Sequence, residues 1–374
     1  MRETGKYQLL GDLSYFIPYP LPPSNPSLQL NTEIISLYGE ASFALGQLNE
    51  MGSRLPDPNR FIKAYVIKEA LLSSAIEGIH TTLIDVFTYP LGESKPNKDT
   101  QLVLNYTKAL DTALTMLKSE GFPIVTRVIL QAHKALMSAG EGEKAAPGNY
   151  RKQSVRVGDH VPPPSIEIPN LMNALERYIN ESSEIPLLIK AGLVHVQFET
   201  IHPFLDGNGR IGRLLIVLML IDSGLLNLPI LYPSHYFKKH HYEYYQRLDR
   251  VRTHGDFEGW IIYYLKALRD NALDAYNRAK EIEALESSLT DLIQKDPHFA
   301  KMRETASRIL NFLFMQPITT IADISQKSGK AYNTVNNVLK QFISLGVISE
   351  NIIHKRNKVY RFELYLTLLE KEYT

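Results

Sequence analysis

The 374-residue sequence contains no cysteine, which excludes disulfide bonds, thiolate nucleophiles and cysteine metal sites. The net charge is only +1, because the sequence has 41 basic and 40 acidic residues, so the molecule as a whole is not a polyelectrolyte. No uninterrupted apolar run reaches the roughly 20 residues that span a bilayer. Residues 1–6 also lack the apolar core of a signal peptide. These absences predict a soluble, cytoplasmic protein with no membrane partner, and the length allows two or three domains.

Helical periodicity dominates what is present. Hydrophobic residues make up 44% of the chain, enough for a substantial core, and we therefore predict a mainly α-helical protein. The expected helices cover residues 31–51, 59–76, 101–119, 126–137, 168–180, 187–198, 211–221 and 236–252, with one or two more over 257–292. Five prolines within residues 15–26 exclude a helix there and predict an extended arm packed on the surface.

One stretch organises the chain: residues 202–213, which read HPFLDGNGRIGR and lie between two apolar helical runs. Its glycines and Asn208 tolerate positive φ, so we predict a short loop that opens onto a helix N-terminus, a natural anion site. Arg210 and Arg213 are three residues apart and share one face of that helix. Together with His202 and Asp206 they supply a base, a metal anchor and charge neutralisation, as phosphoryl or nucleotidyl transfer requires.

This stretch is also compatible with two other interpretations. Asp-Gly-Asn-Gly alone is typical of an ordinary helix–helix turn, and Asp-x-Asn also begins a calcium loop. The calcium interpretation fails because, counting Asp206 as position one, position five is Arg210 and position twelve is Val217. The complete stretch carries every fixed position of HPFx(D/E)GNGRxxR and so resembles the signature of Fic-domain proteins. The resemblance extends over roughly residues 32–273.

The resemblance implies an enzyme that moves AMP from ATP to a Ser, Thr or Tyr hydroxyl of a target protein. His202 would be the catalytic base and Asp206 would hold Mg²⁺. Gly207, Asn208 and Gly209 of the loop would surround the phosphates of ATP, and Arg210 and Arg213 would bind them. The resemblance therefore assigns ATP binding to these five residues. Residues 243–245 resemble the segment that lines the adenine pocket, which adds Tyr244 and Tyr245.

Glu77 follows the helix expected over residues 59–76, and Gly78 fits its C-cap. A carboxylate at a helix C-terminus is unfavourable, so Glu77 is expected to have a cationic partner, although an exposed glutamate is the alternative. Residues 73–78 resemble the (S/T)xxxE(G/N) inhibitory motif of Fic proteins. The resemblance implies that Glu77 autoinhibits the enzyme from within the ATP site, by competing with the γ-phosphate for Arg213.

Residues 150–164 contain the one hairpin candidate of the helical region. Val155, Val157 and Val161 predict extended strands around a Gly158–Asp159 turn, closed by three prolines. A purely structural hairpin is the alternative. The position resembles the Fic flap, which covers the nucleotide and holds the target chain by strand addition. That implies nucleotide or target contacts for Val157, Gly158, Asp159 and His160.

Elsewhere, His195 and Glu199 are four residues apart on the helix expected over residues 187–198 and its end. A histidine packed in the core is favoured over a pair of metal ligands.

Residues 301–374 show a different pattern of expected helices and strands. Helices over 303–315, 320–328 and 332–343, then strands over 347–351 and 359–364 around the basic turn 354–358, predict a winged helix. This region carries 11 basic and 6 acidic residues. DNA binding is one interpretation, but the expected recognition helix offers no arginine and the charge surplus is small for a phosphate-tracking surface. Protein binding or homodimerisation is favoured.

The predicted division is therefore an N-terminal arm and helix (1–58), a Fic core with inhibitory helix and flap (59–295), and a winged-helix domain (301–374). Two alternatives to an autoinhibited adenylyltransferase remain open. One is an ATP-sensing transcription regulator with a DNA-binding winged helix. The other is a Fic enzyme that mainly removes AMP.

Overall fold

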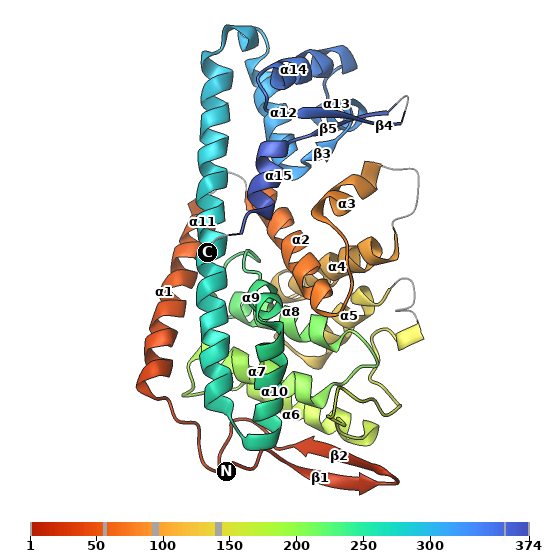
Figure 1. Ribbon diagram of the computed structural model, residues 1–374, viewed down its shortest axis with the longest axis vertical. Helices are drawn as coiled ribbons and strands as arrows, with labels where there is room; N and C mark the ends of the chain where they lie inside the picture. Colours follow the sequence, from red (N-terminus) through yellow and green to blue (C-terminus); the bar gives the residue numbers. More distant parts are fainter. Residues whose placement is uncertain (1, 55–57, 92–96, 139–143, 355–356, 373–374) are drawn as a thin grey trace.

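A long helix, α11 (Phe257–Lys295), connects the two ends of the molecule (Figure 1). The computed structural model describes residues 2–54, 58–91, 97–138, 144–354 and 357–372. The mainly α-helical prediction is confirmed. α11 begins where Asp256 accepts a hydrogen bond from the Gly259 N–H, and α1 (Thr32–Arg54) packs along it. Among the described residues, no helix combines the length and the apolar character that crossing a membrane requires.

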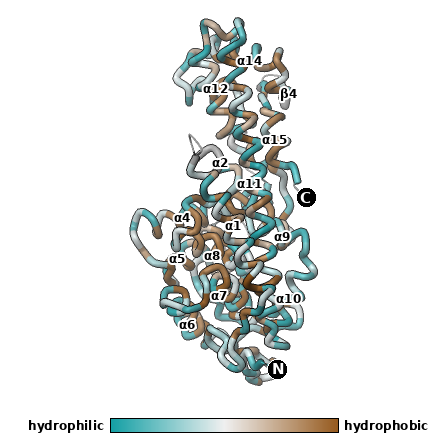
Figure 2. The backbone as a smooth tube through the Cα atoms, turned by 90° about the vertical axis from the view of Figure 1, so that its left-hand side faces the viewer, coloured by the Kyte–Doolittle hydropathy of each residue, from teal (hydrophilic) through white to brown (hydrophobic). Residues whose placement is uncertain are grey.

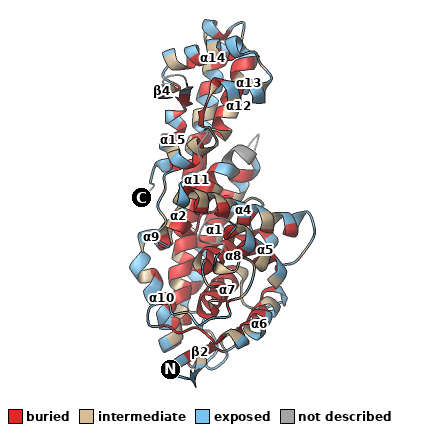
Figure 3. Cartoon of the chain, turned by 90° about the vertical axis from the view of Figure 1, so that its right-hand side faces the viewer, coloured by how far each residue is buried: buried red, intermediate tan, exposed pale blue. Residues whose placement is uncertain are grey.

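The centre of the molecule is a pair of buried helices, α7 (Leu187–Ile201) and α8 (Asn208–Asp222), joined by the loop of the organising stretch. Every residue from Leu188 to Ile201 is buried, and from Ile211 to Ile221 the same holds. Helices that are apolar on all sides belong in a core. The two helices are brown in Figure 2 and largely red in Figure 3, which shows them enclosed by the rest of the fold.

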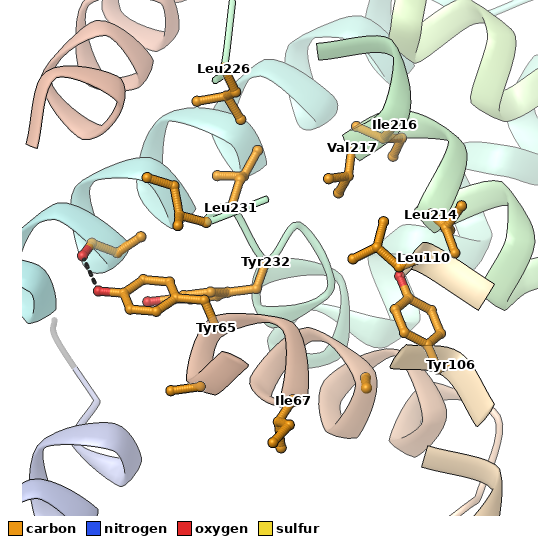
Figure 4. Close-up of a cluster of buried hydrophobic side chains, with 14 of the residues drawn as sticks. Tyr65, Ile67, Tyr106, Leu110, Leu214, Ile216, Val217, Leu226, Leu231 and Tyr232 are labelled. Carbon is orange, nitrogen blue, oxygen red and sulfur yellow. Dashed lines mark hydrogen bonds between the residues drawn. The ribbon is translucent and has the colours of Figure 1, made fainter. Parts of the chain in front are cut away.

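The enclosing helices are α2 (Pro58–Ile76), α4 (Lys98–Lys118), α5 (Thr126–Leu136), α6 (Ile168–Asn180), α9 (Ser234–Lys239) and α10 (His241–His254), with the short α3 (Leu83–Thr88) after α2. Figure 4 shows part of the shared core, where Tyr106 and Leu110 of α4 lie beside Leu214 of α8. Tyr65 of α2 packs against Tyr232 and donates to the Ala275 carbonyl at 2.8 Å. Burying each such side chain contributes about 1.5–3 kcal/mol, which fixes α4 against α8 and α2 against α11 and the segment that carries Tyr232.

The N-terminal segment is extended and non-helical over residues 15–26, as expected, but it also forms a hairpin that the sequence did not predict. β1 (Gly5–Leu10) and β2 (Leu13–Pro18) form an antiparallel hairpin that pairs Gly5 with Pro18. The sequence did not predict it because β1 is mostly exposed on both faces and therefore shows no apolar alternation. Arg2 anchors the segment through hydrogen bonds to both carboxylate oxygens of Glu258, at 2.9 and 2.8 Å.

The C-terminal residues form α12 (Arg303–Met315), β3 (Ile318–Thr319), α13 (Ile321–Ser328), α14 (Tyr332–Ser344), β4 (Ser349–His354), β5 (Asn357–Arg361) and α15 (Glu363–Glu370). The antiparallel sheet has the order β3-β5-β4. The three predicted helices are present at the expected positions. The two predicted strands are present, but all four of their ends were wrong by two or three residues, and α15 was missed; the second strand ends at Arg361, and the chain is helical from Glu363. Lys355 and Arg356 of the predicted basic turn lie outside the described residues.

Candidate active site

The loop between α7 and α8 is closed by its own side chains. α7 ends at His202, whose φ of 49° is left-handed, and Gly207 caps α8 with φ of 79°. Asn208 accepts from the Phe204 N–H at 2.8 Å and donates to the Phe204 carbonyl at 2.9 Å. These bonds fix the loop so that it opens directly onto the N-terminus of α8, as the sequence predicts. The first-turn amides there have no acceptor within the helix, which favours an anion.

Glu77 occupies this anion position. Its carboxylate accepts from Arg213 Nη2 at 2.7 Å, and a Cβ added to Gly209, in the first turn of α8, would lie 2.2 Å from Glu77 Oε1. Burial acts to raise the pKa of Glu77, but the neighbouring Arg213 outweighs it and the pKa is lowered, so the carboxylate is ionised. The cationic partner expected for this glutamate is therefore present.

The two arginines of the motif are buried but differ in how far their donors are used. Arg213 also donates from Nε to Ser73 Oγ and from Nη2 to the Ser73 carbonyl, both at 2.9 Å. Arg210 reaches both oxygens of Asp206 only at 3.4 Å, and within the described part of the chain its buried Nε and Nη1 have no hydrogen-bond partner. A buried guanidinium with unused donors calls for an acceptor-rich ligand.

His202 lies half-buried beside this anion site. Burial, followed by the positive charge of Arg151, lowers the pKa of His202 to about 4, although the Glu77 carboxylate acts in the opposite direction. The imidazole is therefore neutral at pH 7 and able to accept a proton. Asp206, by contrast, points outward with 62% of its side chain exposed and accepts from the Gly207 N–H at 2.6 Å.

The predicted flap is not a pair of strands. Only one bridge forms, in which the Val157 N–H donates to the His160 carbonyl at 2.9 Å and the reverse bond measures 3.0 Å. The following prolines lack N–H donors and stop the pairing, while Val161 instead accepts from the Phe16 N–H of β2 at 2.9 Å. The result is a tight turn whose tip, Gly158 and Asp159, is exposed.

Two other predicted contact residues point into the protein. The His160 ring is buried against Phe16 and bonds the Thr200 carbonyl at 3.0 Å, and burial lowers its pKa to about 3. Tyr244 is buried in an aromatic cluster, where its hydroxyl bonds His195 Nε2 at 2.8 Å. Both rings are bonded to groups inside the protein in this structure, and their contact with a nucleotide or target stays a prediction. Tyr245 is 38% exposed and can reach a ligand. His195 is the core histidine that the sequence favoured over a metal pair.

The structure adds a residue that sequence analysis missed. His133 of α5 stacks on Phe204, with ring centroids 3.7 Å apart and planes 4° from parallel. Its Nδ1 accepts from the Gly148 N–H, so Nε2 carries the proton and donates to the Asp206 carbonyl, each bond measuring 3.0 Å. A single histidine on a helix gave no signal of this role, because the partners come from two distant loops.

These contacts describe a helical protein with a preformed anion-binding loop, a neutral imidazole and two buried guanidiniums. Residues 123–220 match the Fic/DOC family, and residues 35–115 match the Fic/DOC family N-terminal region. The chain is therefore a Fic-domain protein. The motif stretch, α7 and all but the last two residues of α8 fall inside the first match, and α2 with Glu77 falls inside the second.

Similar proteins agree with this assignment. The chain is 30% identical to "Protein adenylyltransferase Fic" of Nematostella vectensis over 252 residues, 64% of this chain and 56% of the relative. It is 27% identical to the Drosophila persimilis protein of the same name over 287 residues, 72% of this chain and 54% of the relative. The chain thus spans little more than half the length of these relatives.

Solved structures share the fold. A Fic family protein from Desulfovibrio desulfuricans G20 superposes with a TM-score of 0.55 at 22% identity, covering 90% of this chain and 97% of that one. Fic-1 from C. elegans gives a TM-score of 0.53 at 20% identity, covering 68% of this chain and 74% of the other.

Proposed function

We propose that this Fic-domain protein is a protein adenylyltransferase that transfers AMP from ATP to a Ser, Thr or Tyr hydroxyl of a target protein and is autoinhibited by Glu77. The observation that carries the proposal is the pair of buried arginines at the N-terminus of α8 beside the neutral His202, with a carboxylate already seated in the anion position. The names of the similar proteins from Nematostella and Drosophila support the same reaction.

His202 is the base in the proposed reaction. It takes the hydroxyl proton as the target oxygen forms a bond to the α-phosphorus. The bond from the α-phosphorus to the oxygen bridging the β-phosphate breaks, and pyrophosphate leaves. Arg210 supplies its unused donors to the phosphates, and the α8 amides near Gly207 and Gly209 cradle them. Tyr245, the partly exposed Val157 and the exposed flap tip, Gly158 and Asp159, are further nucleotide or target contacts, with the buried His160 and Tyr244 behind them.

Asp206 fits a magnesium ion. Mg²⁺ is usually bound by one or two carboxylates together with substrate phosphates, and it would supply charge neutralisation there. Asp206 is exposed and holds Arg210 only at 3.4 Å, so its carboxylate can turn to a cation. The described residues contain no group of three His, Asp or Glu side chains that could hold a metal without the nucleotide.

Glu77 is the proposed brake because Arg213 cannot serve a carboxylate and a γ-phosphate fully at once. With Glu77 engaged, ATP can enter but its α-phosphate is not in line for the target hydroxyl. An Arg–carboxylate pair of this kind corresponds to a regulatory coupling of about 1–3 kcal/mol, or roughly 5–150-fold.

The test is the initial rate of incorporation of AMP, labelled at the α-phosphate, with cell lysate as the source of target. Glu77→Gly should raise the rate at least about tenfold. Adding His202→Ala should then lower it by roughly a hundredfold or more, the usual contribution of a general base. Arg213→Ala should not mimic Glu77→Gly, because the phosphate clamp is lost with the brake. Equal rates in wild type and Glu77→Gly at saturating ATP would contradict the brake, and transfer persisting in the double variant would remove His202 from the mechanism.

Removal of AMP is the alternative reaction at this site. The Glu77 side chain is 32% exposed, so it can reach and orient a water molecule. Release of label from pre-modified target by wild type, lost in Glu77→Gly, would favour this alternative over transfer.

The proposed division places the chemistry in residues 59–295, with the arm and α1 (1–58) packed on it. Residues 301–374 are then a winged helix that holds a partner protein or a second copy of the chain. The exposed face of α14 presents Asn333, Asn337 and Lys340 without an arginine, which supports this use over DNA binding. Fluorescence anisotropy with duplex DNA should show only weak, sequence-independent binding. Nanomolar, sequence-specific binding with a steep salt dependence would support the ATP-sensing transcription regulator instead.

A further inference from the structure

Arg151 lies between the flap and the loop that carries His202, and only 1% of its surface is exposed. Its guanidinium donates to main-chain carbonyls of three segments. Nε donates to the His202 carbonyl at 2.8 Å, Nη1 to the Gln153 carbonyl at 3.1 Å and Nη2 to the Pro163 carbonyl at 2.6 Å. A longer bond of 3.5 Å runs from Nη2 to the Ile201 carbonyl.

A charged side chain that is buried this deeply without a charged partner is unusual. Buried arginines are normally paired with carboxylates. In the described part of the chain, the hydrogen bonds of the Arg151 guanidinium all go to neutral main-chain carbonyls, and burial lowers its pKa to about 10, which leaves it charged at pH 7. Because no carboxylate among the described residues pairs with this cation, its charge acts electrostatically on the nearby His202 imidazole.

We propose that Arg151 is a positioning residue for His202, holding the main chain of the base in its left-handed conformation and tying both legs of the flap to it. This inference rests on the proposed role of His202 in AMP transfer. A non-glycine residue at φ of 49° is strained and persists only where its surroundings hold it. Here the Arg151 side chain binds the His202 carbonyl, and the Arg151 N–H donates to the next carbonyl, that of Pro203, at 2.9 Å.

The same guanidinium also acts on the protonation of the base. Burial and then Arg151 lower the pKa of His202, and Arg252 of α10 acts in the same direction. The main chain of Glu199 and then the carboxylate of Glu77, just after α2, raise it, and the neutral His160 of the flap is a further titratable neighbour. Removing the Arg151 charge should therefore raise the pKa of His202, so the base becomes protonated at a higher pH.

The kinetic test uses the full chain with Glu77→Gly as background, so that transfer is measurable. Arg151→Gln should lower kcat at least tenfold, leave KM for ATP within about twofold, and move the acid limb of the pH–rate profile to higher pH. Arg151→Lys keeps the positive charge but lacks the several N–H donors of the guanidinium. The acid limb of the pH–rate profile should therefore stay at the same pH while kcat falls. Arg127→Gln, which removes an exposed arginine on α5, is the matched control and should change neither quantity.

A second readout does not depend on transfer. The imidazole of His202 is titrated by NMR in the full chain, with His202→Asn to assign its signal, and circular dichroism confirms folding. Arg151→Gln should raise the measured pKa, and Arg127→Gln should not.

The outcomes separate this inference from the proposed function. Folded Arg151→Gln with unchanged kcat and unchanged His202 pKa would overturn the inference. If Arg151→Gln does not fold, full activity in Arg151→Lys would overturn it equally, because the lysine cannot hold the same carbonyls. If Glu77→Gly shows no transfer at all, the proposed function fails, and the NMR titration still decides whether Arg151 acts on His202.

Discussion

A buried guanidinium must find acceptors, and the two arginines of the motif do so in different ways. Arg213 is matched by Ser73 and Glu77, whereas Arg210 keeps two buried donors unused among the described residues. The N-terminus of α8 and the two arginines are therefore complementary to an anion, and the Glu77 carboxylate occupies part of that position. We therefore expect that a phosphate can displace the carboxylate without a rearrangement of the loop, because Asn208 already closes it.

Removing Glu77 should make the fold depend on nucleotide. Glu77→Gly leaves Arg213 buried without its charged partner, and because Glu77 is partly exposed we expect a loss of only about 1–3 kcal/mol in the free energy of unfolding. ATP should restore it by mass action. The measurement is the ATP-induced rise in Tm, which should be larger in Glu77→Gly than in wild type. AMP, which lacks the β- and γ-phosphates, is the control. Equal rises with ATP in both proteins would show that Glu77 does not hold the phosphate site.

At the scale of elements, α7 approaches α11 closely because Gly192 has no side chain. Trp260 Nε1 donates to the Gly192 carbonyl at 2.8 Å, and a Cβ on Gly192 would lie 2.7 Å from the buried ring of Tyr264. This contact seats α7, and with it the loop that α7 carries, against the longest helix of the fold.

Gly192→Ala should therefore lower the free energy of unfolding. Overpacking at a buried contact costs about 1–3 kcal/mol, more than the roughly 1 kcal/mol that alanine contributes to a helix interior. Gly39→Ala is the matched control on α1, because its Cβ meets no atom within 4 Å and the residue is exposed. Urea unfolding should give opposite signs for the two variants, and stabilisation by both would show that α7 and α11 have room to separate.

At the scale of the whole molecule, the C-terminal unit is tied to the core through Arg278 of α11. This arginine donates to the carbonyls of Leu368 and Lys371 and pairs with Asp274 at 3.1 Å. Lys68 of α2 donates to the Leu369 carbonyl at 3.0 Å. The unit therefore contacts α2, the helix that Glu77 directly follows (Figure 1).

Arg278→Ala should loosen this attachment. It leaves Asp274, 4% exposed, without its buried cation, and breaking a buried pair in this way costs about 3–5 kcal/mol. Hydrogen exchange over residues 363–372 should accelerate along with the loss of stability. Lys295→Ala, at the 77% exposed end of the same helix, should change stability by less than about 1 kcal/mol. Unchanged exchange in Arg278→Ala would mean that α15 is held by its apolar contacts alone.

The sequence by itself determined the elements whose causes are local. The apolar runs of α7 and α8, the left-handed glycine at the α8 N-cap and the cationic partner of Glu77 follow from periodicity, from backbone sterics and from the helix dipole. Three helices of the C-terminal unit, α12, α13 and α14, were likewise predicted within one residue, whereas α15 was missed.

Only the tertiary structure decided which side chains meet across the fold. The β1–β2 hairpin, the single bridge in the flap, the inward turn of His160 and Tyr244 and the roles of His133 and Arg151 all depend on partners far away in the chain. Such contacts form because burial and hydrogen bonding to distant carbonyls outweigh local preference. The sequence pattern indicates that a residue can be buried, but it does not identify the residues that it packs against. The contacts that position His202 could therefore be found only in the tertiary structure.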